Sequence, residues 1–512
     1  MQRRQFLKLW GIPLPLLSSC STQMPLFTPP LAGPALPEAD DWQQFQLQLQ
    51  GQLLGQDHDE FARRAKSANS RFDRQVPAVI VQVASGADVQ LTLQFVRRFN
   101  LPFAIRGGGH SYTGLSGTAG LLLDMGRLQQ IHYADGQVRI GAGAKLGDVY
   151  AALAAYQQSI PAGSCASVGI AGLMQGGGLG IADRMYGLTC DALLEAEIVT
   201  ADGQLLRCNA NQHADLFWAL RGGGGGQFGV LTELTFQTFP TAPVRNYIGR
   251  YPLENGELVL TEWQRWAAQL PDTVWTQLAI WVNGNSKKTP EIQIRCCGIG
   301  HQADVTQAWQ QLENRLSGLW GEVDMQDHLY LDFMLSDCKG LDSNQCKLPG
   351  QHDAGKLKRV AMAGSSDMFN NILPAPGCQA LLSAMRKRAQ QGQTGAVLLT
   401  LMGGAIAAKP RDYNAFAHRR ALFSAQYLTI HPEHSDEPLL AQSAAWCHQM
   451  RYLMRRWSSG GAYLNYTDGL MKHPATAYYA GHYARLQQIK RQYDPQSLFR
   501  QRQGIKVGYV SS

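Results

Sequence analysis

Apolar and polar positions between residues 79 and 105 follow the pattern of a β-α-β unit. Residues 79–83 form a short, mostly apolar run, as in a buried strand. Ser85 can cap a helix that follows, and Val89, Leu93 and Val96 recur at the spacing of one helical face. Residues 102–105 form the next strand and end at a glycine-rich loop. We therefore expect this strand to position that loop.

The pattern continues as a mixture of strands and helices as far as residue 243. It predicts strands at 121–124, 138–140 and 230–239, helices at 146–156 and ending at 217–221, and a hairpin over 193–207. The hairpin turn lies at Asp202-Gly203, a dipeptide typical of tight turns between strands. This region is predicted to have an α+β fold.

From residue 244 to 450 the glycine-rich loops stop and tryptophan becomes frequent. Six of the eleven tryptophans lie between Trp263 and Trp320, where they could stack on sugar rings or fill a core. Strand-like stretches at 276–282, 291–296 and 396–402 alternate with helical ones, which predicts a β-sheet backed by helices. Cys296 and Cys297 should point to opposite faces of one strand.

Length and charge limit the classes of protein to be considered. A chain of 512 residues is too long for one ordinary core, so we expect two or three domains. Hydrophobic residues make up 45% and charged residues 17%, which fits a folded soluble protein. The net charge is +7, with three of the basic residues in the first 19 positions and no basic stripe with interleaved aromatic residues. This pattern argues against a nucleic-acid partner.

The first 20 residues resemble an export signal. Arg3 and Arg4 are followed by a weakly apolar stretch at 9–17 and then by Leu17-Ser18-Ser19-Cys20. The first feature resembles a twin-arginine signal and the second a bacterial lipoprotein cleavage box, with Cys20 as the acylated residue. We expect export by the twin-arginine route and a lipid-anchored protein on the periplasmic side of the envelope. Proline-rich residues 21–41 then suit an extended spacer.

Two glycine-rich segments each carry one nucleophile. Residues 105–114 contain Gly107-Gly108-Gly109 and His110, and residues 163–180 contain Cys165. Glycines let backbone amides approach a pyrophosphate closely, and amide dipoles at such a turn would favour the Cys165 thiolate. An electrophilic isoalloxazine ring can be captured by an imidazole or a thiolate. The pairing predicts a flavin-dependent redox enzyme.

Both segments resemble the FAD-linked oxidases of the vanillyl-alcohol oxidase superfamily, in particular its berberine-bridge-enzyme-like branch. The resemblance implies a two-part FAD-binding domain of the PCMH type, with an inserted substrate domain. We divide the chain into a signal at 1–20, a spacer and lead-in at 21–60, a first FAD-binding part at 61–243, a substrate domain at 244–450 and a C-terminal return at 451–512. It also implies FAD bonded to His110 through its 8α-methyl carbon and to Cys165 through C6. The residues expected to hold FAD are Arg106, Gly107, Gly108, Gly109, His110, Ser111, Tyr112, Gly163, Cys165, Val168, Gly169, Gly172, Gly176, Gly177, Gly178, Gly180, Val230 and Asn465.

The same resemblance suggests the catalytic groups. The stretch Tyr463-Leu464-Asn465-Tyr466 matches the family's Tyr-x-Asn-Tyr signature, so Tyr463 and Tyr466 are both candidate bases. On a strand, Tyr463 and Asn465 would share one face and Tyr466 the other. Val168 stands where relatives control oxygen access, and valine there goes with oxidase behaviour. The expected activity is oxidation of a bulky alcohol or sugar-like small molecule, with oxygen as acceptor and peroxide as product.

Other readings stay open on sequence alone. The enzyme could be a dehydrogenase that feeds another acceptor, or the fold could serve as a surface binding module. Residues 141–147 have the wrong glycine spacing for a nicotinamide-binding motif. His431 and His434 are separated by Pro432 and lack an acid or cysteine cluster, so we expect a surface loop and no metal site. Cys338 and Cys346 could form a disulfide or remain thiols.

Overall fold

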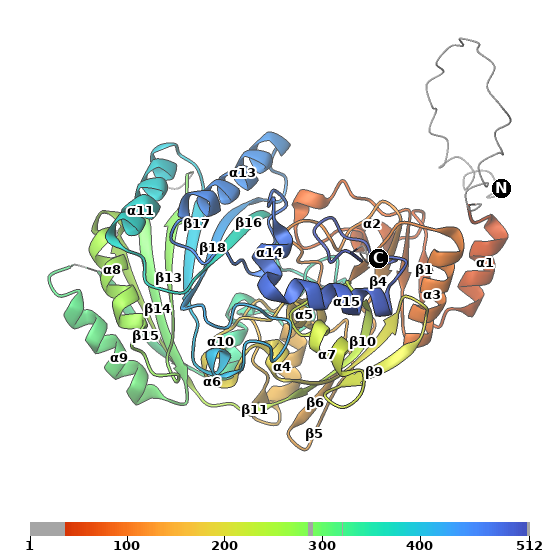
Figure 1. Cartoon of the computed structure of the whole chain (residues 1–512), viewed down its shortest axis with the longest axis horizontal. Coiled ribbons are helices and arrows are strands. Elements are labelled where there is room, and N and C mark those ends of the chain that lie inside the picture. Colours follow the sequence, from red (N-terminus) through yellow and green to blue (C-terminus); the bar gives the residue numbers. More distant parts are fainter. Residues whose placement is uncertain (1–35, 285–289, 320, 509–512) are drawn as a thin grey trace, which may run out of the picture.

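The computed structural model describes residues 36–284, 290–319 and 321–508. A sheet with helices on its outer side lies next to a second, mixed half that contains the N-terminal strands and the last helices (Figure 1). The signal at 1–20 and most of the proline-rich stretch lie outside the described residues, so both remain predictions. No helix in the described ranges is long and apolar enough to span a bilayer.

The predicted β-α-β unit forms the first sheet, and Ser85 caps the helix as expected. Its hydroxyl accepts a hydrogen bond from the Asp88 amide at 3.3 Å, and the helix buries Val89, Leu93 and Val96. The strand order is β1-β2-β4-β3, with β4 parallel to both β2 and β3. The elements are β1 (Gln52–Leu54), α2 (Phe61–Arg64), β2 (Val79–Gln82), α3 (Gly86–Phe99), β3 (Phe103–Arg106) and β4 (Leu121–Asp124).

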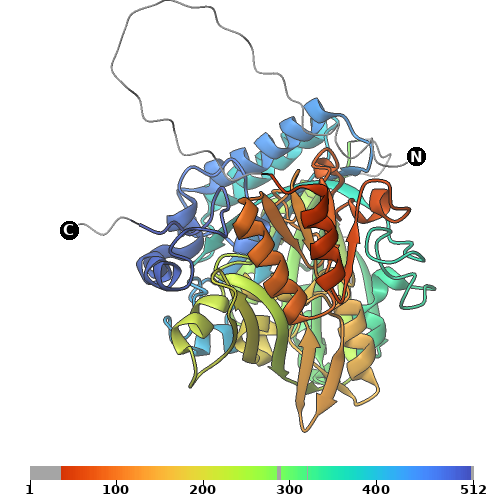
Figure 2. The ribbon, with the colours of Figure 1, turned by 90° about the vertical axis from the view of Figure 1, so that its right-hand side faces the viewer.

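The N-terminal lead-in belongs to this half of the molecule, in contrast to the predicted boundary at residue 61. Helix α1 (Ala39–Gln48) packs beside α3, with the Phe45 and Phe95 rings stacked 4.4 Å apart (Figure 2). Strand β1 pairs with β2. The extended spacer must therefore end before Ala39, because from there the chain contributes to the core.

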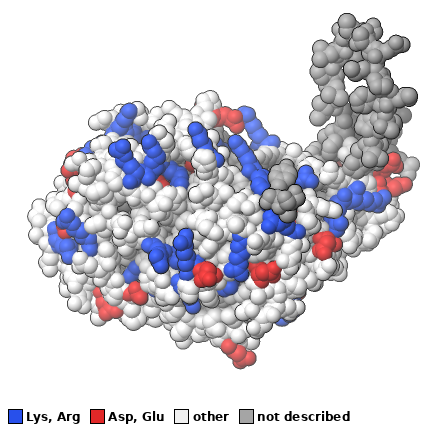
Figure 3. Space-filling model, viewed as in Figure 1, with Lys and Arg blue, Asp and Glu red and all other residues white. Residues whose placement is uncertain are grey.

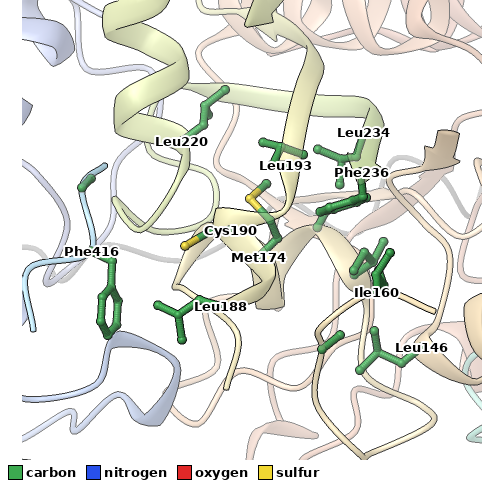
Figure 4. Packing of buried hydrophobic residues seen from close by; sticks show 14 of the residues in the cluster. Leu146, Ile160, Met174, Leu188, Cys190, Leu193, Leu220, Leu234, Phe236 and Phe416 are labelled. Atoms are coloured by element: carbon green, nitrogen blue, oxygen red, sulfur yellow. The ribbon is translucent and has the colours of Figure 1, made fainter. Parts of the chain in front are cut away.

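A second, five-stranded antiparallel sheet completes the first half. Its order is β5-β6-β10-β8-β9, and the predicted hairpin is β8 and β9. Helices pack on this sheet around one large apolar cluster that includes Met174, Leu193 and Phe236 (Figure 4). The elements are β5 (Ile131–Ala134), β6 (Gln137–Gly141), α4 (Leu146–Ala154), β7 (Gln158–Ser159), α5 (Ile170–Gln175), α6 (Asp183–Tyr186), β8 (Leu193–Thr200), β9 (Leu205–Asn209), α7 (Ala214–Leu220), β10 (Gly229–Gln237) and β11 (Phe239–Pro240).

The second half is a seven-stranded antiparallel sheet with helices on one face, as predicted. Its order is β15-β12-β14-β13-β17-β18-β16. The strands are β12 (Val244–Pro252), β13 (Trp275–Val282), β14 (Glu291–Ile299), β15 (Glu322–His328), β16 (Val360–Phe369), β17 (Gly395–Leu401) and β18 (Phe423–Pro432). The helices on that face are α8 (Gly256–Ala267), α9 (Gln302–Arg315), α11 (Ala375–Gln390) and α13 (Glu437–Met454), whereas the short α10 (Tyr330–Met334) and α12 (Ala405–Ala408) pack against α4 and α6 of the first half.

Three tryptophans of this half are core residues. Trp263, Trp266 and Trp309 fill the space between the sheet and its helices. Cys296 joins that core, whereas Cys297 joins the core of the other half, so the two cysteines do face opposite sides of β14. Stacking on a sugar by these three rings is therefore excluded by their burial.

The last segment returns to the first half, as expected. Helix α15 (Tyr483–Tyr493) lies beside α7, and α14 (Pro474–Tyr479) precedes it and packs against it (Figure 1). Lys490 forms a buried ion pair with Asp494 at 2.6 Å and also donates to the Phe499 carbonyl. Asp494 in turn accepts from the Phe499 amide at 2.9 Å. These bonds fix the turn that brings residues 498–501 to the site described next.

Candidate active site

A cavity of about 1130 Å³ lies between the two halves and contains both predicted nucleophiles, His110 and Cys165. Ligand pockets usually measure about 300–1,000 Å³, so this one has room for a dinucleotide and a substrate together. Most of the predicted cofactor residues line it: Gly107, Gly108, Gly109, His110, Ser111, Tyr112, Gly163, Cys165, Val168, Gly169, Gly172, Val230 and Asn465.

The two nucleophile-bearing loops cross at a pair of glycines. A Cβ atom on Gly108 would overlap the backbone nitrogen of Gly169, and one on Gly169 would lie 2.5 Å from the Gly108 nitrogen. Gln351 joins the loops by donating to the carbonyls of Gly108 and Ser167, both at 2.8 Å. Because these glycines have no side chains, the two loops can cross in direct contact. The crossing brings His110 and Cys165 to one cavity.

His110 is held as a neutral imidazole. Its Nε2 lies 3.0 Å from the Ser167 hydroxyl, and Ser167 is the one hydrogen-bond partner of the ring among the described residues. Burial lowers the pKa of His110 to about 4, opposed by a hydrogen bond from the ring to the Ser167 backbone and assisted by the charge of Lys145. An uncharged ring has a free lone pair, which a nucleophile requires.

Cys165 lies deep in the molecule, yet its side chain is exposed to the cavity. Burial raises the pKa of the thiol, and the negative charge of Asp337 raises it further. The sequence argument expected glycine-rich amides to favour the thiolate. That expectation is wrong for the protein alone, because desolvation and Asp337 both favour the neutral thiol.

The cavity wall fits a planar, polar group such as a flavin. Gln175 lines the cavity, and no described residue accepts a hydrogen bond from its buried side-chain nitrogen, Nε2. Gly172 faces open space, since an added Cβ would meet no atom within 4 Å. A flat glycine surface and an unsatisfied buried donor suit a ring with acceptor atoms along its edge. These features and the two nucleophiles together match FAD.

Tyr463 and Asn465 also line the cavity, and hydrogen bonds hold their side chains in its wall. The phenol oxygen of Tyr463 accepts from the amides of Gly178 at 2.8 Å and Leu179 at 3.1 Å, and from the Asn465 side chain at 2.9 Å. Residues Leu464–Tyr466 form a 3₁₀ turn, so the predicted strand is wrong, although Tyr463 and Asn465 do lie together as expected. Because the turn brings Asn465 back onto Tyr463, these two side chains contact each other directly.

Five predicted cofactor residues do not line the cavity. Gly176, Gly177, Gly178 and Gly180 pack under the tyrosine turn or against neighbouring backbone. Arg106 points away from the cavity and donates to the carbonyl of Ser116 at 2.9 Å. Their role is to shape the loops, and the glycine run is needed because the Tyr463 and Asn465 side chains press on it.

Tyr466 is placed differently from Tyr463. Its ring stacks at 5.9 Å on Tyr112, and its hydroxyl has no hydrogen-bond partner among the described residues. Tyr112 is clamped to the other half of the molecule, because its hydroxyl accepts from Gln426 at 2.8 Å. Burial raises the pKa of Tyr466 well above its ordinary value, and Tyr112, Tyr463 and Cys165 add to that rise.

Two family models match this chain. An FAD-binding domain covers residues 77–209, and the model described as "Berberine and berberine like" covers residues 462–506. The matches include both nucleophile loops and the tyrosine turn. In these two segments the chain matches the FAD-linked oxidoreductases of the berberine-bridge-like family.

Individual relatives and solved structures agree with these two matches. An uncharacterized FAD-linked oxidoreductase of Bacillus subtilis (strain 168) is 28% identical, over 89% of this chain and 97% of the relative. A monolignol oxidoreductase of Arabidopsis thaliana is 28% identical, over 84% of each chain. The structure of Physcomitrella patens BBE-like 1 matches with a TM-score of 0.82 and 25% identity, over 91% of this chain and 99% of that one. The glucooligosaccharide oxidase of Acremonium strictum shares the fold, with a TM-score of 0.79 and 23% identity over 90% and 97% of the two chains.

The seven-stranded sheet supplies a second wall that the sequence reasoning missed. Alternate residues of its strands face the cavity while their neighbours enter the helix-backed core; on β17, for example, Leu398 faces the cavity and Val397 and Leu399 the core. The wall of the flavoenzyme is mostly aliphatic. Its members are Gln277, Val360, Met362, Leu398, Gln426, Leu428 and Ile430. The two-residue alternation of these strands was visible in the sequence, but the sequence does not show which face of each strand points into the cavity.

A third set of residues closes the cavity from the C-terminal side. Gly225 and Gln227 meet Gln501, which donates to the Gly225 carbonyl at 2.7 Å and accepts from the Gln227 side chain at 2.6 Å. The glycine run at 222–226 was visible in the sequence, but nothing there showed that residues 498–501 would join it.

The structure also decides the state of Cys338 and Cys346 and the position of His431. Cys338 and Cys346 form a disulfide, and they pack against Ala166 beside the Cys165 loop. His431 is not in a surface loop: it is buried in β18, where its Nε2 lies 2.8 Å from the Ser443 hydroxyl. Strand β18 extends as far as Pro432, although this proline had suggested a loop around His431.

Proposed function

We propose that the flavoenzyme holds FAD through two covalent bonds, at His110 and Cys165, and oxidises a hydroxyl group of a bulky small molecule. One observation carries this proposal. A single cavity brings together the imidazole, the thiol, an unpaired tyrosine hydroxyl and a broad side-chain wall from the second half. The glucooligosaccharide oxidase of Acremonium strictum, which is described with a 6-S-cysteinyl, 8α-N1-histidyl FAD, shares the fold and supports the linkage.

The two nucleophiles have distinct requirements. Because Ser167 engages Nε2 of His110, the ring offers Nδ1 to the cavity. Cys165 must lose a proton that burial and Asp337 retain, so its bond should form only when the electrophile is already in place. We therefore expect His110 to react first and Cys165 second.

Tyr466 is the proposed base. Bound FAD would supply the hydride acceptor. Tyr466 lines the cavity with a free hydroxyl, whereas the Tyr463 hydroxyl is occupied by three donors. Tyr112 keeps the Tyr466 ring in place by stacking, and Gln426 fixes Tyr112. The substrate hydroxyl proton would pass to the Tyr466 oxygen.

Oxygen is the proposed electron acceptor, which makes the protein an oxidase. Val168 lines the cavity in the Cys165 loop, and a valine at this place goes with oxygen use in relatives. Val168→Leu should slow reoxidation by oxygen but not by an artificial dye. An unchanged oxygen rate in this variant, or a wild-type enzyme that uses only the dye, would favour the alternative dehydrogenase.

A carbohydrate is the first proposed substrate class, because a chitooligosaccharide oxidase and a xylooligosaccharide oxidase share this fold. A second class, an alcohol with an aromatic or other apolar body, is favoured by the aliphatic wall formed by Val360, Met362, Leu398, Leu428 and Ile430. Apolar surface of this kind stabilises an apolar ligand by about 25 cal/mol for each Å² buried. The description of one relative as a monolignol oxidoreductase points the same way.

The decisive experiment is a peroxide-coupled screen of purified protein against oligosaccharides and aromatic alcohols, run beside a dye-coupled screen. Peroxide with either class supports the proposal and chooses between the classes. A yellow protein without turnover on any hydroxyl compound would contradict it. A colourless protein that binds glycan would support a binding module instead.

The cellular place of the protein is proposed from residues outside the structure. Arg3 and Arg4 would direct export by the twin-arginine route, and Cys20 would carry the lipid. Cys20→Ala should leave the protein soluble after cell breakage, while the unaltered chain stays with the membrane fraction. Equal behaviour of the two would contradict a lipid anchor.

A further inference from the structure

A groove of about 800 Å³ runs between α11 and α13, on the side of the seven-stranded sheet that faces away from the flavin cavity. It shares no lining residue with that cavity. Lys and Arg side chains gather over α11 and the neighbouring end of α13 in the same region (Figure 3). The groove is therefore a separate feature of the surface, and the proposed reaction does not use it.

The charge of this region is one-sided. Residues 376–411 contain five Lys or Arg, residues 438–467 contain three, and neither stretch contains an Asp or a Glu. Four of these cations line the groove: Lys387, Arg388, Arg455 and Arg456. None of the four has a carboxylate within ion-pair distance among the described residues, whereas nearby Arg451 is paired with Asp367 at 2.8 Å. Arg388 is buried, so the uncompensated positive charge that the groove presents comes from the exposed Lys387, Arg455 and Arg456.

Aromatic rings lie directly beneath these cations. The Arg388 guanidinium sits 4.5 Å from the Trp446 ring and is fixed by the Thr394 carbonyl at 3.0 and 3.1 Å. Arg455 lies 3.5 Å from the ring of Tyr452, which is 61% exposed. Trp446 and Arg388 are themselves buried, at 9% and 3% exposed, so it is the exposed Tyr452 ring that offers an apolar face to a ligand, with the Arg455 cation against its other face.

Amide side chains complete the lining. Gln391, Gln393, Gln442 and Gln449 all contribute to the groove. Each amide can both donate to and accept from a hydroxyl group. Cations for carboxylates, aromatic faces for sugar rings and amides for hydroxyls together match one type of ligand.

We propose that this groove binds an acidic polysaccharide whose sugar rings carry carboxylate groups. The positive charge is complementary to such a chain, and a concave channel suits an extended polymer better than the flat surface of a bilayer. The groove would hold the protein on the polymer while the flavin cavity, on the other face of the sheet, stays open.

The test uses the full flavoenzyme and alginate, with the propylene glycol ester of alginate as the neutral probe of the same backbone. Affinity electrophoresis should show retardation by alginate and not by the ester, and added salt should weaken it because exposed charges are screened. Equal retardation by both probes, or none by alginate, would overturn the proposal. Binding to phosphatidylglycerol vesicles or single-stranded DNA with no binding to alginate would also overturn it.

Matched variants locate the site. Arg455→Ala with Arg456→Ala should weaken binding by about tenfold, given charge-assisted contacts of modest strength. Arg97→Ala with Arg127→Ala removes the same charge from exposed positions on the other half and should change affinity by less than about twofold. Equal losses in the two pairs would show that only net charge matters and would overturn the groove as the binding site.

Tyr452→Ala should also weaken binding, and an unchanged affinity would overturn the stacking arrangement. Unaltered melting temperature and flavin content would confirm that each variant is folded.

Discussion

The two sides of the flavin cavity are built in different ways. The side formed by the first half is made of backbone: glycines at 107–109, 163, 169 and 172 bring two loops together and present His110 and Cys165. The side formed by the second half is made of side chains that point from alternate positions of β13, β16, β17 and β18. The first side is fixed by the needs of a cofactor, and the second can vary with the substrate.

This difference explains how substrates could change within one fold. Replacing Leu398 or Leu428 alters one projecting side chain and leaves the strand ladder intact. Replacing Gly108 or Gly169 disturbs the crossing of two loops on which both nucleophiles depend. The predictions that follow test this division, beginning with the largest expected effect.

Removing both nucleophiles should abolish the covalent attachment of the flavin. The wild-type protein should give a yellow pellet after acid precipitation, and His110→Ala with Cys165→Ala should release all of the dye into the supernatant. Each single variant should keep flavin in the pellet, because one bond suffices. A wild-type pellet without colour would contradict the double linkage.

Tyr466→Phe should lower kcat by at least about 100-fold, the usual minimum for loss of a general base. Tyr463→Phe should instead lower stability, because it leaves the amides of Gly178 and Leu179 without an acceptor, at about 1–3 kcal/mol for each buried donor. Steady-state kinetics and thermal melting separate the two outcomes. A larger kinetic loss in Tyr463→Phe would exchange their roles.

The pH dependence of the reaction provides a further check on Tyr466. Since burial raises the pKa of Tyr466, the fraction of its phenolate grows with pH, and kcat should rise through the alkaline range. The same profile recorded for Tyr466→Phe should lose this rise.

Two glycines in the cavity wall should respond oppositely to alanine. Gly108→Ala places a methyl group against the Gly169 backbone, which cannot move aside as a side chain can. The destabilisation should therefore reach or exceed about 3 kcal/mol, the upper end of the usual range of about 1–3 kcal/mol for an overpacked site. Gly172→Ala meets no atom within 4 Å and lies in helix α5, so the fold should tolerate it. Its methyl group points into the cavity, however, and should reduce flavin content. Normal flavin content in Gly172→Ala would place the ring elsewhere.

Asp183 should make the stability of the first half fall with rising pH. Burial raises the pKa of Asp183 to about 7, against the opposing hydrogen bond from the Gly180 amide and the charge of Arg184. A carboxyl group with a raised folded-state pKa stabilises the fold fully at low pH, and this contribution is lost as pH rises through about 7. Between pH 5 and pH 8 the loss is on the order of 2–3 kcal/mol.

Asp183→Asn should remove that part of the dependence in denaturant melts at the two pH values. Asp367, whose pKa burial also raises to about 7, should leave a second part in place. The exposed Asp40→Asn should behave as the wild type does. An Asp183→Asn profile identical to that of the wild type would contradict the pKa assignment.

The sequence by itself determined the elements and chemistry that depend on neighbouring residues. Ser85 caps its helix, the turn at Asp202-Gly203 closes its hairpin, and His110 and Cys165 stand in glycine-rich loops, because capping, turn formation and loop flexibility are local properties. Only the tertiary structure decided which groups share the cavity. Among the described residues it left the Tyr466 hydroxyl free and occupied that of Tyr463, kept Gly176, Gly177, Gly178 and Gly180 out of the lining, and used Gln351 and Gln501 to tie segments that are far apart in the chain. Those contacts depend on the way whole strands and loops pack, and burial in that packing, rather than the nearby amides, sets the proton affinity of Cys165.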